Sequence, residues 1–186
     1  RPYIVLKWAE TSDGFIAPKA KDEQKPIWIT NEFSRQLVHK WRTEEHAILV
    51  GTNTVIEDNP SLTARDWTGN QPTRIVIDKE DKLSKDYHVF NKKAKTISIT
   101  KNHINFSENI AQQICAVLLE NEINSVIIEG GAKTLQSFIN NNLWDEARIF
   151  IGPHVFNSGT KAPTIFRKLI SEKSILEDTL KIYKND

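Results

Sequence analysis

One short stretch of the sequence has residues that could bind an anion. SVIIEGGAKTLQSFI (residues 125–139) runs from an apolar segment through Glu129 to Gly130 and Gly131, and then into a helical pattern. Glycines let a ligand approach the backbone closely, and free N–H groups at the start of a helix favour a bound anion. The stretch matches neither G-x-G-x-x-G nor the Walker pattern, so by itself the pair is more typical of a structural turn.

Other charged residues could hold or orient a substrate. Glu129 ends an apolar run, where a carboxylate needs a partner or the dipole of the following helix. Asp58 precedes an Asn-Pro pair and is either a functional carboxylate or an Asx-turn residue. Arg42 and Arg65 have the forked geometry that binds phosphate, although such side chains are commonly solvated. Lys7 lies within an apolar strand, where a lysine usually snorkels or pairs.

A metal site is not expected. The five histidines are scattered without metal-ligand spacing, and His39 and His46 are interpreted as structural or exposed. Cys115 is the single cysteine, so it cannot form an internal disulfide or a multi-cysteine metal site. It lies in an apolar helical stretch and is expected in the core.

Hydrophobic periodicity predicts the elements that position these residues. Strands are expected at residues 3–9, 46–51, 73–78, 95–100, 125–131 and 146–153, and helices at 31–42, 52–58, 108–121 and 132–142, the first capped by Thr30 or Asn31. Strands alternating with helices indicate an α/β fold, with a mostly parallel central sheet flanked by helices. Residues 174–185 are expected to add an antiparallel strand or hairpin. Ligands bind at the carboxyl ends of such strands, and segments 11–27 and 151–165 are expected to be binding loops.

Composition indicates an ordinary globular protein. The chain has 186 residues, 39% of them hydrophobic, with 25 basic and 24 acidic side chains. This size and balance indicate one domain, with neither a nucleic-acid nor a membrane partner. No apolar run approaches the ~20 residues that span a bilayer and no signal-peptide layout is present, so a cytoplasmic setting is expected. The chain contains no methionine, and we therefore expect it to be a segment of a longer protein.

Six stretches together resemble a known family. They are RPYIVLKWAETSDGFIA, WIT, VHKWRTEEHAILVGTNTVIEDNPSLTAR, PTRIVID, IIEGGAKTLQSFI and LWDEARIFIGP. In this order they are similar to the reductase domain of bacterial riboflavin biosynthesis, which resembles dihydrofolate reductase in fold. The resemblance covers residue 1 to about residue 163. It implies a single reductase domain over residues 1–186 with a dihydrofolate-reductase-like fold.

The resemblance also implies a reaction and a set of site residues. The reaction is the NADPH-dependent reduction of a phosphorylated aminouracil ribotide, 5-amino-6-(5-phosphoribosylamino)uracil, to 5-amino-6-(5-phosphoribitylamino)uracil. The ribose opens to an imine, and hydride reaches C1. The implied catalytic residues are Lys7, Asp58 and Glu129, and the implied substrate contacts are Arg42, Leu62, Arg65 and Glu129, with the two arginines clamping the phosphate. The implied cofactor contacts are Ala9, Trp28, Thr54, Asp58, Gly131, Ala132, Lys133, Thr134, Leu135, Gln136 and Ser137. Thr100 and Lys101 are expected to meet the 2′-phosphate of NADPH.

The chain departs from the family pattern in two places. Residues 25–27 are Lys-Pro-Ile where many members have small residues and a serine, and Asn59 replaces a common aspartate. The family also implies a homodimer and, in the parent chain, an N-terminal zinc deaminase domain, whose His-Ala-Glu and Pro-Cys-x-x-Cys signatures are missing here. Two alternatives remain open. One is a dihydrofolate-reductase-like pterin reductase, and the other is a non-catalytic nucleotide-binding domain.

Overall fold

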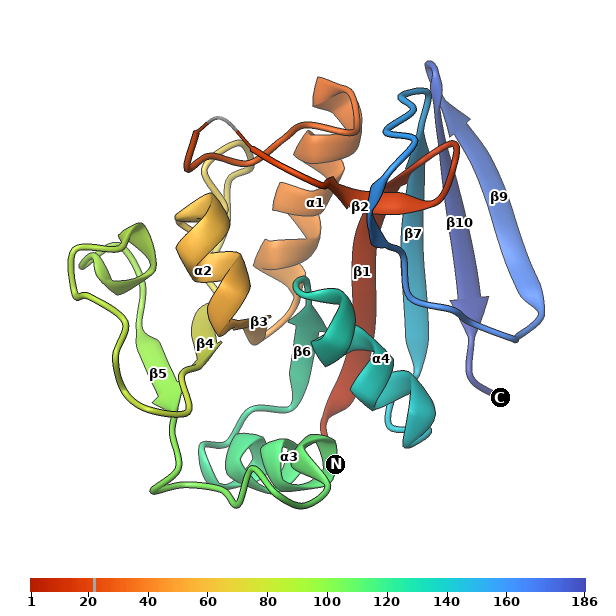
Figure 1. Cartoon of the computed structure of the whole chain (residues 1–186). Coiled ribbons are helices and arrows are strands. Elements are labelled where there is room, and N and C mark those ends of the chain that lie inside the picture. The colour runs from red at the N-terminus through yellow and green to blue at the C-terminus, as the bar shows by residue number, and fades with distance from the viewer. Residues whose placement is uncertain (22) are drawn as a thin grey trace.

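The centre of the protein is an eight-stranded sheet. The computed structural model describes residues 1–21 and 23–186 (Figure 1). The strand order is β5-β4-β3-β6-β1-β7-β10-β9, and the first six strands in that order are mutually parallel. These six are β1 (Tyr3–Thr11), β3 (Ala47–Gly51), β4 (Thr73–Ile77), β5 (Thr96–Ile99), β6 (Ser125–Ile128) and β7 (Glu146–Gly152). All six agree in place with the strands expected from the sequence.

The C-terminal end of the chain completes the sheet with an antiparallel hairpin. β10 (Asp178–Lys184) pairs with β7 on one side and with β9 (Leu169–Ile175) on the other. A second small sheet joins β2 (Phe15–Pro18) to β8 (Gly159–Lys161). The predicted fold class is therefore confirmed. The sequence did not indicate β2 and β8, which are very short, or most of β9, whose side chains are almost all exposed, so no buried face marks them.

Helices cover both faces of the sheet (Figure 1). Alternate side chains of β1 point to opposite faces, as a strand requires. Ile4, Leu6 and Trp8 pack in a core cluster with α3 and α4, whereas Val5 packs with α1 on the other face. The helices are α1 (Glu32–Glu44), α2 (Thr52–Asp58), α3 (Ile110–Glu120) and α4 (Ala132–Asn140), with a 3₁₀ turn η1 (His88–Phe90). Cys115 is buried in the α3 cluster, as expected. None of the helices in the described ranges is long and apolar enough to cross a bilayer.

The start of α1 is fixed to the C-terminal hairpin. The Asn31 side chain accepts a hydrogen bond from the Ser34 N–H at 3.0 Å, which confirms Asn31 as the cap. Asp178 of β10 accepts hydrogen bonds from the Asn31 N–H at 2.9 Å and from the Ser34 hydroxyl at 2.6 Å. These contacts set the position of α1 along the sheet. They thereby place His39 and Arg42, which lie further along the same helix.

Candidate active site

A cavity of about 870 Å³ opens at the carboxyl ends of the parallel strands. Its wall includes Val50 and Gly51 at the end of β3, Ile77 at the end of β4, and Glu129 directly after β6. Side chains from α1, α2 and the start of α4 complete it. This is the location that ligands occupy in open α/β sheets, as expected from the order of the elements.

A buried ion pair lies at the α1 side of the cavity. Glu129 continues the alternation of β6, so it shares with Ile127 the face that α1 covers, and Lys7 shares that face with Val5. The Arg42 guanidinium binds both carboxylate oxygens of Glu129, Nη2 to Oε2 at 2.7 Å and Nε to Oε1 at 3.2 Å. The side chains of Arg42 and Glu129 are only 11% and 7% exposed. Arg42 is therefore the partner that a carboxylate in this buried position needs.

The cluster shifts the protonation of its members. Burial lowers the pKa of Lys7; the Glu129 charge opposes this effect, and the Arg42 charge adds to it. Burial alone would raise the pKa of Glu129, but Arg42 and Lys7 outweigh it and hold that pKa below its ordinary value. Glu129 is thus a carboxylate near neutral pH, and Lys7 releases its proton more readily than an exposed lysine does.

The glycine turn after β6 is closely packed against two threonines. A Cβ added to Gly130 would lie 2.8 Å from Thr54 Oγ1, and one added to Gly51 would lie 3.0 Å from Thr134 Oγ1. Gly131 has φ 74° and is the N-cap residue of α4, so it has no side chain to cap the first N–H groups of that helix. The backbone of this turn therefore lies open to the cavity, in a form suited to an anion.

The end of α2 and the loop after β2 contribute further residues to the cavity wall. Asp58, at the end of α2, pairs with Lys21. Trp28 lines the cavity with half of its surface exposed, and the Arg35 guanidinium lies 4.8 Å from its ring centroid. These residues therefore add charged and aromatic groups to the cavity wall.

Most of the expected site residues meet at this cavity. Those that line it are Lys7, Ala9, Trp28, Arg42, Thr54, Asp58, Leu62, Arg65, Glu129, Gly131, Ala132, Lys133, Thr134 and Leu135. Gln136 and Ser137 are not among the described residues that line it, because they lie further along α4. Gln136 instead accepts a hydrogen bond from the Thr164 N–H at 2.9 Å.

Two residues expected at the cofactor end lie outside the cavity wall. Thr100 and Lys101 are not among the described lining residues, and Lys101 forms an ion pair with Glu80 at 3.0 Å. Lys79 lines the cavity instead. It follows directly after the β4 strand and Asp78, so a check of every residue beyond a strand end would have found it.

Sequence reasoning also missed His39. It was interpreted as structural or exposed; its side chain is 4% exposed, which agrees with the structural interpretation, and it also contributes to the cavity wall. Burial, together with the charges of Arg42 and Arg65, lowers the pKa of His39 to about 4, so the imidazole is neutral at pH 7. A signal was present, since His39 is three residues before Arg42 and shares its face of α1.

Two curated relatives are similar to this chain. The riboflavin biosynthesis protein RibD of Aquifex aeolicus is 38% identical over 175 residues, which cover 86% of this chain and 48% of that protein. The 2,5-diamino-6-ribosylamino-4(3H)-pyrimidinone 5′-phosphate reductase of Archaeoglobus fulgidus is 27% identical over 193 residues, which cover 89% of this chain and 86% of that protein. The chain thus spans about half the length of the RibD relative but most of the archaeal one.

Solved structures agree with the fold. A Thermotoga maritima diaminohydroxyphosphoribosylaminopyrimidine deaminase/5-amino-6-(5-phosphoribosylamino)uracil reductase has a TM-score of 0.85 at 30% identity, over 99% of this chain and 56% of that one. Dihydrofolate reductase from Enterococcus faecalis, in complex with NADP(H), has a TM-score of 0.60 at 14% identity, which shows the fold alone. The sequence model of the RibD C-terminal domain family matches residues 2–182. The chain therefore belongs to the RibD C-terminal domain family.

Proposed function

We propose that this chain is a reductase domain of riboflavin biosynthesis. Its reaction would be the NADPH-dependent reduction of 5-amino-6-(5-phosphoribosylamino)uracil to the ribitylamino product. The main support is the buried Arg42–Glu129 pair, which lies beside Lys7 in the same cavity as the open glycine turn. The archaeal relative, which is named as a reductase and is covered almost in full by this fold, supports a reductase rather than a deaminase.

The residues of the glycine turn fit a dinucleotide cofactor. The close approach of Gly130 to Thr54 and of Gly51 to Thr134 leaves backbone, rather than side chain, facing the cavity. The uncapped N–H groups at the start of α4 can hold the pyrophosphate. Such a cofactor, when bound, supplies the hydride. Thr54, Trp28 and the first turn of α4 are proposed to hold it.

The charged side of the cavity fits the phosphorylated substrate. The Arg42 charge is matched by Glu129, whereas the Arg65 guanidinium is half exposed and lies 3.8 Å from Asp66, beyond hydrogen-bond distance. Arg65 is therefore the cation best placed to bind a phosphate dianion, with Arg42 and Leu62 beside it. Arg42 in turn orients Glu129 toward the sugar.

Lys7 and Glu129 are proposed to support the chemical step. The imine nitrogen needs one proton before hydride reaches C1, and the cationic imine so formed becomes a neutral amine when the hydride adds. Lys7 can give that proton, because burial lowers its pKa. Glu129 stays ionised and stabilises the cationic imine before reduction. The positive charge of the imine is lost when the hydride adds, and the product amine is neutral.

Selection of the cofactor is assigned to Lys79. Its side chain is 58% exposed and its nearest acidic partner, Glu80, lies 4.0 Å away. Lys79 is thus available to a 2′-phosphate, in contrast with the paired Lys101. Lys79→Ala should raise KM for NADPH about tenfold and leave KM for NADH nearly unchanged. An equal effect on both cofactors would refute this role.

Absorbance at 340 nm during turnover tests the proposed function. We expect the folded protein to oxidise NADPH when given the aminouracil ribotide, and we expect little oxidation with dihydrofolate. The diamino-pyrimidinone ribotide serves as a second substrate, since the archaeal relative is named for it. Folded protein that leaves NADPH unchanged with both ribotides would sink the proposal. Faster turnover of dihydrofolate would favour the pterin alternative.

The remaining expectations concern the setting of the enzyme. We propose that the protein is a cytoplasmic homodimer. We also propose that its reaction is adjacent to a deamination in the same pathway, since the Thermotoga relative is named for both activities. Light scattering at micromolar concentration tests the dimer. A monomeric mass with full turnover would remove it.

A further inference from the structure

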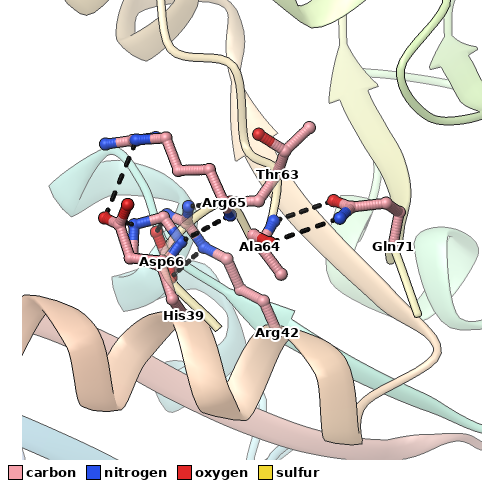
Figure 2. A network of polar contacts seen from close by, with 8 residues as sticks. His39, Arg42, Thr63, Ala64, Arg65, Asp66 and Gln71 are labelled. Atoms are coloured by element: carbon pink, nitrogen blue, oxygen red, sulfur yellow. Dashed lines mark hydrogen bonds and ion pairs between the residues drawn. The ribbon is translucent and has the colours of Figure 1, made fainter. Parts of the chain in front are cut away.

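We infer that His39 is a positioning residue for the phosphate-binding arginine. Its imidazole holds the backbone of Arg65 so that the Arg65 guanidinium, which is ion-paired with Asp66 but not hydrogen-bonded to it, lines the cavity and can bind an anion there. This inference rests on the proposed function, in which the substrate carries a phosphate. Figure 2 shows the polar network around this loop.

Four successive residues of the loop after Leu62 are each held by a side chain from elsewhere (Figure 2). The Thr63 carbonyl accepts a hydrogen bond from Arg42 Nη1 at 3.0 Å. Gln71 binds both backbone groups of Ala64, with its Oε1 2.8 Å from the Ala64 N–H. The last two residues, Arg65 and Asp66, each contact one of the two ring nitrogens of His39.

The hydrogen bonds define the tautomer of His39. Nδ1 accepts a hydrogen bond from the Arg65 N–H at 3.1 Å, so it carries no proton. The proton of the neutral ring is therefore on Nε2, which lies 3.2 Å from Asp66 Oδ2. A neutral imidazole is the form that can make both contacts at once. A cationic ring has no acceptor and would lose the bond to Arg65.

The two contacts have different consequences for Arg65. The bond from the Arg65 N–H sets where the side chain leaves the loop. The bond to Asp66 Oδ2 holds that carboxylate 3.8 Å from Arg65 Nε, a distance at which the two form an ion pair but no hydrogen bond. The Arg65 side chain is 50% exposed and lines the cavity. His39 thus keeps a cation directed at the cavity while restraining the anion that would compete for it.

Two amide substitutions separate these contacts. His39→Asn places Oδ1 near the position of Nδ1 and keeps an acceptor for the Arg65 N–H. His39→Gln reaches toward Asp66 and loses that acceptor. We expect His39→Gln to raise KM for the phosphorylated ribotide about tenfold, with kcat within about twofold, and His39→Asn to raise KM distinctly less. Equal KM values for both variants and the parent would overturn the inference.

A double-mutant cycle with Arg65→Ala gives the decisive result. If His39 acts through Arg65, His39→Gln has no further effect on KM once Arg65 is alanine. A merely structural His39 gives additive losses, and that outcome refutes the role. The same logic applies to the phosphate: a substrate that lacks it should show no change in KM between parent and His39→Gln.

His46→Gln is the matched control. His46 Nδ1 also accepts a backbone hydrogen bond, from the Asn124 N–H at 3.3 Å, but it lies just before β3 at the amino ends of the strands. We expect unchanged KM and kcat. Thermal unfolding of every variant checks that the loss at His39 is not a loss of fold.

Calorimetric titration with ribose 5-phosphate separates this inference from the proposed function, because it needs no turnover. Binding by the parent that weakens about tenfold in His39→Gln supports the positioning role, even if neither ribotide is reduced. Unweakened binding in His39→Gln overturns that role, even if the parent is an active reductase. Absence of binding by the parent at ribose 5-phosphate concentrations up to about 10 mM also overturns it, since Arg65 then receives no phosphate.

Discussion

Arg74 and Arg42 are both largely buried, and their surroundings differ. Arg74 on β4 is fully buried, and its guanidinium donates to carbonyl oxygens of Ser61, Asn91 and Ala94, among others. Among the described residues no carboxylate pairs with it. Arg42 pairs with Glu129 at the edge of a large cavity. One guanidinium ties separate loops together, and the other holds a charged group where a ligand can reach it.

The surroundings of a buried charge indicate whether its role is structural or functional. Carbonyl groups around Arg74 accept hydrogen bonds from both of its Nη atoms, whereas Nε has no partner among the described residues, and burial lowers the pKa of the guanidinium. The Arg42 cluster instead places the Glu129 carboxylate, the Arg42 guanidinium and the Lys7 amine at one cavity, and the pKa values of Lys7 and Glu129 are both shifted there. Perturbed groups in a cavity are the signature of a functional site. Four predictions test this contrast.

The largest effect is expected at Arg74. Arg74→Met leaves several buried carbonyl groups without a donor, and it should lower the free energy of unfolding by about 3–5 kcal/mol. Urea unfolding measures this loss. Arg167→Met is the control, because Arg167 is exposed and its removal should change stability by no more than about 0.5 kcal/mol. A change below about 1 kcal/mol for Arg74→Met would remove the structural role.

Glu129→Gln should affect turnover more than stability. The amide keeps the shape of the side chain but loses the charge that balances Arg42 and Lys7. We expect kcat to fall about 100-fold, equal to about 3 kcal/mol in the barrier, with a smaller loss in unfolding free energy than at Arg74. Steady-state NADPH oxidation measures it, with the exposed Glu120→Gln as control. Activity within about threefold of the parent would favour a non-catalytic domain.

The third prediction concerns pH. The pKa of His39 is about 4 in the folded protein and 6.5 without perturbation, so the unfolded chain binds more protons between these values. The contribution of His39 to stability is complete above pH 6.5 and is lost as pH falls toward 4. From pH 7 to pH 5 the parent should lose about 2 kcal/mol more than His39→Asn. Arg42, Arg65, Asp66 and Glu129 face the ring and are common to both proteins.

Urea unfolding of the parent and His39→Asn at pH 7, 6 and 5 gives the comparison. Parallel loss of stability in the two proteins would mean that the ring titrates alike in the folded and unfolded states. In the Arg74 region, Arg74→Met should leave the pH dependence of stability between pH 5 and 7 unaltered, since its guanidinium is not expected to titrate in that range.

The smallest effect is expected at Asp58, at the end of α2. Asp58 and Lys21 form a partly exposed pair, with side chains 28% and 17% exposed, and such pairs contribute little to stability. Asp58→Asn should raise KM for NADPH about threefold and change the unfolding free energy by less than about 0.5 kcal/mol. A fall in kcat as large as that of Glu129→Gln would instead place Asp58 in the chemical step.

Local patterns were enough for much of the architecture. Alternating apolar residues such as Ile4, Leu6 and Trp8 predicted the central strands, and Asn31 predicted the start of α1, because both signals depend on neighbours in sequence. The exposed strand β9 could not be found this way, since its partner β10, rather than a buried face, holds it in the sheet.

The sequence by itself determined the order of strands and helices, the apolar faces and the residue types that chemistry needs. Only the tertiary structure decided which of them meet. Arg42 and Glu129 are 87 positions apart, and His39 and Arg65 are 26 apart, so their contacts depend on strand register and on where α1 packs. The tertiary structure likewise places Lys79, and not Lys101, among the described residues that line the cavity. Contacts between distant residues follow from how crossovers place whole elements, and no local pattern of side chains records that placement.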